Sequence, residues 1–141
     1  MTEARLESVV ASVDDARVFL HQARRFAGDA GTEGLSGTSR QLLLFQACLA
    51  ACDAALLAAG WRVEGAEGGH ILRLRETAKL LDLDDALLDE LDEVRLVRGD
   101  SAYRAGLVMD HQVEDAAEVT QRLLDEVERF VAGDARRRRE R

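Results

Sequence analysis

The sequence has 141 residues, 47% of them apolar, and contains no proline. This length allows one ordinary domain that buries its own core. Abundant alanine and leucine without proline favour helix and argue against a sandwich or barrel, whose turns use proline. The formal net charge is −8, and removing the +4 of residues 136–141 leaves −12. An acidic body repels phosphate, so any nucleic-acid contact should be local, through an arginine cluster or the basic tail.

Targeting and membrane-spanning segments are not expected. The amino-terminal region does not combine basic residues with a long apolar run, and no stretch approaches the roughly 18 apolar residues of a membrane span. The sequence therefore predicts a cytoplasmic protein without membrane contact.

A first helix is predicted to begin at the N-cap Thr2 and to end at Gly28. Apolar residues at spacings of four and three form its buried face: Leu6, Val10, Val13, Ala16, Leu20, Ala23 and Ala27. Four scattered glycines follow, at 28, 31, 34 and 37, with no strand before them and no Lys-Ser/Thr after them. They favour a flexible connector over a phosphate-binding loop, which needs a strand-to-helix frame.

A second helix, from about Thr38 to Ala59, is apolar almost all round, which is typical of a central bundle helix or of one shared with a dimer interface. Cys48 and Cys52 lie one turn apart on it, a separation unsuited to a disulfide, and are expected to be reduced core residues. Its one polar line, which includes Asp53, either faces solvent or places Asp53 near an arginine such as Arg95 or Arg98.

A third helix is predicted from about Gly69 to Leu81, after Trp61, which should cap the bundle end. Glu67 and His70 have the spacing of a di-iron ligand pair, but two glycines separate them and no second pair exists. We therefore expect no metal centre.

Asp84 should cap a fourth helix that ends near Gly99 and Asp100. Leu87, Leu91, Val94 and Arg98 are spaced four, three and four apart, so they share the buried face. Arg98 must then be paired or reach water in a cleft, because an unpaired buried charge is costly. Arg95 lies one turn below it.

A fifth helix should begin at Asp110 and stop at Gly133. It is expected to bury Val113, Ala117, Thr120, Leu124, Val127 and Val131. The sequence thus predicts an all-α, five-helix antiparallel bundle with no sheet, made of one domain (1–133) and a basic, disordered tail (134–141).

The order of these parts resembles the HEPN family of small helical bundles. The resemblance covers the long first helix, the alanine-rich QLLLFQACLAACDAALLAAG, the third helix GGHILRLRETAKLL, the RLVRGDSAY junction and the closing amphipathic helix. It implies a homodimer in which two copies of an arginine-to-histidine motif, four to six residues apart, meet in a cleft. Catalytic members of this layout are metal-independent ribonucleases without a cofactor, often toxins paired with a nucleotidyltransferase antitoxin.

The chain departs from the family motif at its histidine. Tyr103 follows Arg98 with four residues between them, and it stands where the family has histidine. A histidine can move the proton of a 2′-hydroxyl near neutrality, whereas a phenol with a pKa of about 10 is a poor base. Arg104 and His111, with six residues between them, also fit the motif, although His111 is expected to face solvent.

The candidate ligand-binding residues are therefore Arg95, Arg98, Asp100 and Tyr103. The candidate catalytic residues are Arg98 and Tyr103, followed by the weaker pair Arg104 and His111. A purely structural role for Arg98 and Tyr103 stays open. The resemblance implies a dimeric, RNA- or nucleotide-associated or regulatory protein of a bacterial toxin-antitoxin or defence module, with a degenerate motif. The alternatives are an active endoribonuclease toxin and a non-enzymatic adaptor that docks a protein partner.

Overall fold

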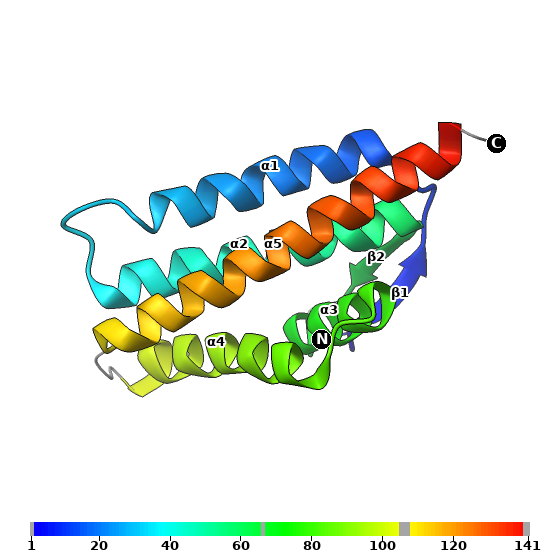
Figure 1. Ribbon diagram of the computed structural model, residues 1–141. Coiled ribbons are helices and arrows are strands. Elements are labelled where there is room, and N and C mark those ends of the chain that lie inside the picture. The colour runs from blue at the N-terminus through cyan, green and yellow to red at the C-terminus, as the bar shows by residue number, and fades with distance from the viewer. Residues whose placement is uncertain (1, 66, 105–107, 140–141) are drawn as a thin grey trace.

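The computed structural model describes the backbone of residues 2–65, 67–104 and 108–139, and the side chains of these residues except 97–104 and 134–139. The elements follow in the order β1 (Arg5–Ser8), α1 (Val13–Asp29), α2 (Gly37–Ala59), β2 (Trp61–Glu64), α3 (Gly69–Leu81), α4 (Asp85–Arg104) and α5 (Asp110–Arg139) (Figure 1). The prediction of a mostly helical chain with five helices is confirmed.

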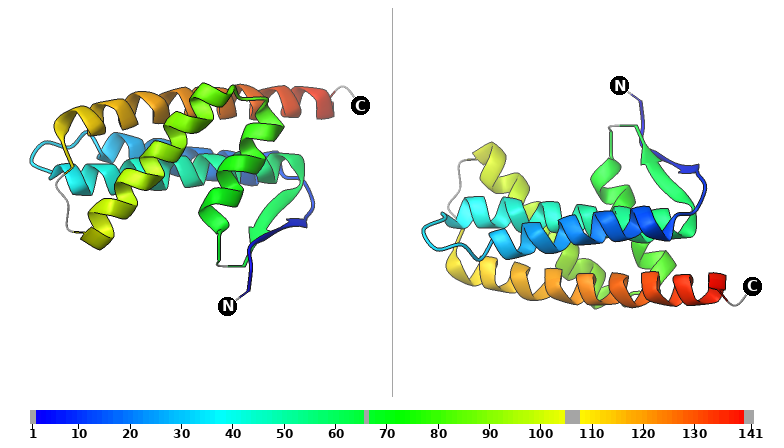
Figure 2. Two further views of the ribbon diagram at one scale, coloured as in Figure 1. Left: turned by 90° about the horizontal axis from the view of Figure 1, so that it is seen from below. Right: turned by 90° about the horizontal axis from the view of Figure 1, so that it is seen from above.

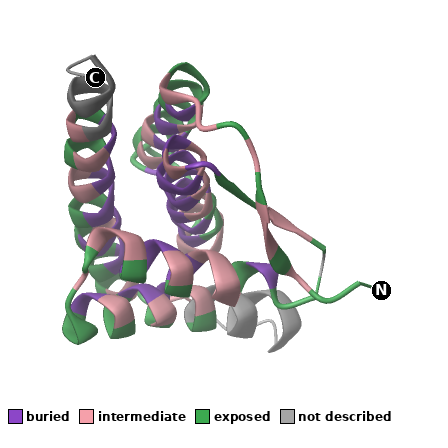
Figure 3. Ribbon diagram, turned by 90° about the vertical axis from the view of Figure 1, so that its right-hand side faces the viewer, coloured by how far each residue is buried: buried purple, intermediate pink, exposed green. Residues whose placement is uncertain are grey.

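Helix α2 is the centre of the molecule, because each of the other helices packs against it. Helix α1 runs antiparallel to α2, and α5 runs in the same direction as α2 along one edge of the molecule (Figures 1 and 2). Helices α3 and α4 pack against α2 and α5. Buried residues lie on the helix sides that face this interior (Figure 3). The core combines large residues of α2 and α5 with small ones that let α1 approach: Leu44, Leu56, Leu123, Leu124, Val127, Ala16 and Ala23.

The ends of α2 are set by local chemistry. The Ser36 hydroxyl accepts a hydrogen bond from the backbone N–H of Ser39 at 3.1 Å, and Gly60 ends the helix in the left-handed conformation with φ 93°. Among the described residues α2 is also the one helix long and apolar enough to cross a membrane, contrary to the sequence expectation. Since 56% of that stretch is buried against the rest of the chain, α2 has the surroundings of a core helix.

The predictions of no sheet and of a first helix from Thr2 are wrong. Strands β1 and β2 pair antiparallel, with Leu6 opposite Val63, and α1 begins only at Val13. Helix formation starts there because the Ser12 side chain accepts from the N–H of Asp15 at 3.1 Å. Trp61, directly after α2, opens β2 and has 40% of its surface exposed.

Two predicted helix ends are also wrong. Helix α4 continues past Gly99 and Asp100 to Arg104, and α5 continues past Gly133 to Arg139. Residues 134–139, which were predicted to belong to a disordered tail, are therefore part of helix α5. A single glycine inside a helix costs only about 1 kcal/mol relative to alanine, so glycine alone does not end one.

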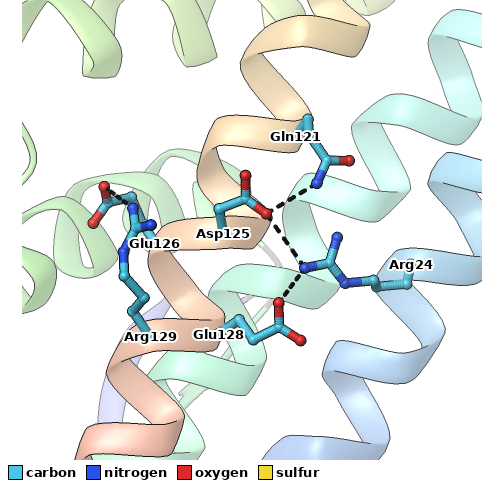
Figure 4. A network of polar contacts seen from close by, with 6 residues as sticks. All are labelled: Arg24, Gln121, Asp125, Glu126, Glu128 and Arg129. Carbon is cyan, nitrogen blue, oxygen red and sulfur yellow. Dashed lines mark hydrogen bonds and ion pairs between the residues drawn. The ribbon is translucent and has the colours of Figure 1, made fainter.

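Helix α1 is tied to α5 by a polar network on the surface (Figure 4). The Arg24 guanidinium of α1 donates to Asp125, at 3.4 Å, and to Glu128 of α5, and Gln121 donates to Asp125 at 3.0 Å. These groups are exposed enough for water to screen them, so each ion pair contributes less than about 1 kcal/mol. The network fixes the register of α1 on α5 and adds little to stability.

Candidate functional site

A cavity with a volume of about 460 Å³ lies between α2, α4 and α5. Its floor is buried and its rim is exposed. The floor is formed by Gln41 of α2, Val94 of α4, and Ala116 and Val119 of α5. The rim is formed by Glu90, Glu93, His111, Asp115, Glu118 and Arg122. We call this cavity the acidic pocket.

The rim carries more negative than positive charge. Its four carboxylates face a single guanidinium, that of Arg122, which pairs with Glu90 at 2.9 Å. No cation among the described side chains pairs with Glu93, Asp115 or Glu118. With His111 neutral the rim therefore carries a net charge of −3. Such a rim attracts cations and repels phosphate.

Gln41 is a polar group of the pocket floor with an unmet hydrogen-bonding requirement. The residue is only 1% exposed. Its Nε2 donates a long hydrogen bond, 3.4 Å, to the carbonyl of Val94, and its Oε1 accepts none from the described residues. A buried acceptor without a donor costs about 1 to 3 kcal/mol. This oxygen has less than 1 Å² of accessible surface, so it is enclosed behind the floor of the pocket.

The sequence candidates are only partly brought to this pocket. His111 is exposed, as expected, and lines its rim. Arg95 lines a different cavity, of about 180 Å³ between α3 and α4, where its Nε lies 2.8 Å from Asp92. The structure therefore does not bring Arg95 and His111 together. The side chains of Arg98, Asp100, Tyr103 and Arg104 lie outside the described residues.

A second polar cavity, of about 370 Å³, lies between α1, α2 and α3, and we call it the Asp53 pocket. Asp53 accepts a hydrogen bond from Nε of Arg73 at 2.8 Å, whereas Arg95, one of the two expected partners, pairs with Asp92. Burial raises the pKa of Asp53 above its ordinary value, and the charge of Arg73 and its hydrogen bond act against that rise. Phe19 and Phe26 of α1 contribute apolar surface to the same cavity.

The two cysteines of α2 are buried and free, which confirms their expected place in the core. Burial raises the pKa of Cys48 to about 11, against a hydrogen bond with Thr120, and the pKa of Cys52 to about 12. Both thiols therefore stay protonated at neutral pH. Because the thiolate is the nucleophile and the metal ligand, neither cysteine is a candidate for catalysis or metal binding.

Metal chemistry gains no support from the described side chains, where no three His, Cys, Asp or Glu residues are arranged to hold an ion. Comparison with protein-family models and with curated proteins finds no match for this chain.

Sequence reasoning missed most of this pocket, although a signal was present. Residues 111, 115, 118 and 122 are spaced four, three and four apart, so they share one face of α5. Gln41 shares a face with the apolar residues Leu44, Phe45 and Cys48. A polar residue on an apolar helix face marks a buried amide, and such an amide needs a partner.

Proposed function

We propose that this chain is a HEPN-like helical protein that acts by binding, not by catalysis, and that the acidic pocket receives a positively charged group of its partner. The observation that supports this is the set of three rim carboxylates, Glu93, Asp115 and Glu118, without a cation among the described side chains. The homodimer of the HEPN family is part of the same proposal.

The sign of the charge decides between partners. A phosphate group in the pocket would face a net charge of −3, and the one rim guanidinium is already paired with Glu90. A lysine or arginine side chain would meet carboxylates at the rim and an apolar floor for its methylene groups. Any RNA or nucleotide contact would use an arginine cluster outside the acidic pocket, such as the arginines at 98 and 104 or those of the basic tail.

A metal-independent ribonuclease is the second candidate, and one observation favours it. His111, which belongs to the weaker of the two matches to the motif, lines the acidic pocket, where a general base could reach a bound substrate. Its neighbours weaken this candidate, because a base in an acidic pocket lacks the positive charge that stabilises a phosphate transition state.

The setting expected from the resemblance stays a proposal: a cytoplasmic member of a bacterial toxin-antitoxin or defence module, with a nucleotidyltransferase as a partner protein. Tyr103 in place of histidine supports a regulatory role over a toxic one.

The test compares two fluorescent probes, a tetra-arginine peptide and a single-stranded RNA, on the full-length protein. We expect the peptide to bind, and Glu93→Gln with Asp115→Asn to weaken its binding at least about tenfold, since a charge-assisted hydrogen bond contributes about 1.5 to 3 kcal/mol. The charge-matched control, Asp14→Asn with Glu33→Gln, replaces two exposed carboxylates outside the pocket and should leave binding nearly unchanged.

The same RNA reports on catalysis. We expect cleavage no faster than in buffer for the wild-type protein. Cleavage that disappears in His111→Ala, or in Tyr103→Phe, would overturn the binding proposal in favour of the ribonuclease. Failure of the peptide to bind, with tight RNA binding, would also overturn it.

A further inference from the structure

The Asp53 pocket has the size and lining of a small-molecule site. Such sites have volumes of about 300 to 1,000 Å³ and combine apolar walls with a few polar groups. The Asp53 pocket has a volume of about 370 Å³. Helix α1 contributes Phe19 and Phe26 to its lining, α2 contributes Leu49 and Asp53, and α3 contributes Arg73. The pocket therefore offers apolar surface and one pair of charged groups to a small ligand.

The polar end of the pocket is the pair of Asp53 and Arg73. Nε of Arg73 donates to Oδ1 of Asp53 at 2.8 Å, which joins α3 to α2. The exposed fractions of the Asp53 and Arg73 side chains are 27% and 22%. A guanidinium has five N–H donors and a carboxylate accepts about four hydrogen bonds, so their mutual contact does not use them all. The pair therefore holds the fold and still has donors and acceptors for a group in the pocket that both residues line.

The charges of the pocket lining cancel. Among the lining residues that the structure describes, Asp53 is the one carboxylate and Arg73 the one guanidinium or ammonium group. With His70 neutral, their charges of −1 and +1 sum to zero. An anion would gain the attraction of Arg73 but meet the repulsion of Asp53, and a cation the reverse, so neither recovers the cost of losing its water. The pocket therefore favours an uncharged ligand, in contrast to the acidic pocket.

Phe19 and Phe26 form the aromatic wall of the pocket. They are seven residues apart on α1, which places both on one face of the helix. Both are half-buried, so part of each side chain remains accessible. Aromatic rings pack against one another in offset-stacked or edge-to-face geometry. A ligand with an aromatic ring would therefore bury apolar surface against this wall.

We infer that the Asp53 pocket binds an uncharged aromatic compound that carries a primary carboxamide. The carboxamide has an acceptor and a donor in one plane without net charge: its oxygen accepts from the guanidinium of Arg73, and its NH₂ group donates to the carboxylate of Asp53. The aromatic ring packs against Phe19 and Phe26. None of the described residues lines both this pocket and the acidic pocket, so the inference goes beyond the proposed function and does not depend on it.

Three probes that share one aromatic ring test the inference: uncharged benzamide, the anion benzoate and the cation benzylammonium. Each is titrated into the full-length protein and followed by two-dimensional NMR of the backbone amides. We expect benzamide to bind at millimolar concentration and to shift the amides of Phe19, Asp53 and Arg73. The two charged probes should bind at least about tenfold more weakly. Absence of benzamide binding, a charged probe that binds as tightly, or shifts confined to another part of the chain would overturn the inference.

Two substitutions should change the charge preference of the pocket. Asp53→Asn leaves the lining with a charge of +1 and should favour benzoate, whereas Arg73→Gln leaves it with −1 and should favour benzylammonium. Each should also weaken benzamide binding, because one of its two polar partners is altered. A folded variant that keeps the wild-type preference for benzamide would overturn the role of the pair. The ranking of the three probes on the wild-type protein tests the inference even where a variant does not fold.

The control is Glu93→Gln with Asp115→Asn, which removes two carboxylates from the acidic pocket. This variant should bind benzamide as the wild-type protein does, although its binding of the tetra-arginine peptide should be weakened. A wild-type protein that binds the peptide but not benzamide would overturn the inference and keep the proposed function. Binding of benzamide without binding of the peptide would have the opposite meaning.

Discussion

The acidic pocket and the Asp53 pocket are lined by similar types of residue, but they differ in whether their carboxylates are paired with cations of the same chain. Each lies between three helices and combines apolar walls with carboxylates. In the Asp53 pocket the half-buried Asp53 has its cation within the chain, Arg73 at 2.8 Å. In the acidic pocket three carboxylates and the buried amide oxygen of Gln41 have no partner among the described side chains.

This difference separates groups that hold the fold from groups available to a partner. A charge that is paired inside the chain contributes to folding, and loss of its partner is costly because the remaining charge stays partly buried. A group without a partner in the folded chain contributes nothing to folding or opposes it. Substitutions in the Asp53 pocket are therefore expected to lower the free energy of unfolding. Substitutions in the acidic pocket are expected to weaken binding and to leave the free energy of unfolding nearly unchanged.

The largest effect on the free energy of unfolding is expected from truncating a buried core side chain that supports the wall of the acidic pocket. Leu91 is 2% exposed and holds α4 to the core beside the acidic pocket. Leu91→Ala should lower the free energy of unfolding by roughly 2 to 5 kcal/mol, the range for a buried leucine. Leu96 on the same helix is 47% exposed, and Leu96→Ala should cost less than about 0.5 kcal/mol. Equal denaturant midpoints for the two variants would show that α4 is packed by another face.

The next effect concerns the balanced pocket. Arg73→Met should lower the free energy of unfolding at pH 7 by about 1 to 3 kcal/mol, because Asp53 then remains half-buried without its cation. Chemical denaturation of both proteins at a series of pH values measures the deficit.

The pH dependence of this deficit identifies its cause. Burial already raises the pKa of Asp53, so the folded state binds that proton more tightly than the unfolded chain, and stability from this group falls as pH rises through the folded pKa. Removing Arg73 should raise the pKa further. The deficit of Arg73→Met should therefore shrink as the pH falls to the ordinary value of 3.8 and Asp53 becomes protonated. A deficit that is the same at pH 4 and pH 7 would assign it to lost packing of the arginine stem.

A smaller effect on stability is expected in the acidic pocket. Glu93→Gln and Asp115→Asn should each change the free energy of unfolding by less than about 0.5 kcal/mol, since both residues are exposed and have no cation among the described side chains. Their effect should appear in binding instead. A loss of 2 kcal/mol or more in either variant would mean that the pocket is balanced by groups within the chain.

Long periodic elements could be predicted from the sequence, and short or three-dimensional features could not. The apolar spacing of Leu87, Leu91 and Val94 identified the buried side of α4, and the helix predicted from about Thr38 to Ala59 matches α2 (Gly37–Ala59). The strands were missed because four residues, such as Arg5–Ser8, carry too little periodicity to outweigh a helical pattern that begins at Leu6.

The candidate site was predicted less well than the fold. The motif led to His111, which lines the acidic pocket, but the pocket depends on Gln41, more than fifty positions away in the sequence. The Asp53 partner, Arg73, likewise lies on another helix, and no local pattern joins the two. Which groups are paired and which remain available depends on how the helices pack, and helical periodicity does not contain that information.

The most direct test of the comparison is to measure stability and binding together for Glu93→Gln with Asp115→Asn in the full-length protein. Both residues are exposed and have no cation among the described side chains, so the free energy of unfolding should change by less than about 1 kcal/mol. Affinity for the tetra-arginine peptide should fall at least about tenfold, because the pocket loses two of its three unpaired carboxylates. Unchanged affinity with a loss of stability of about 2 kcal/mol or more would contradict the account, because these carboxylates would then serve the fold and not the ligand.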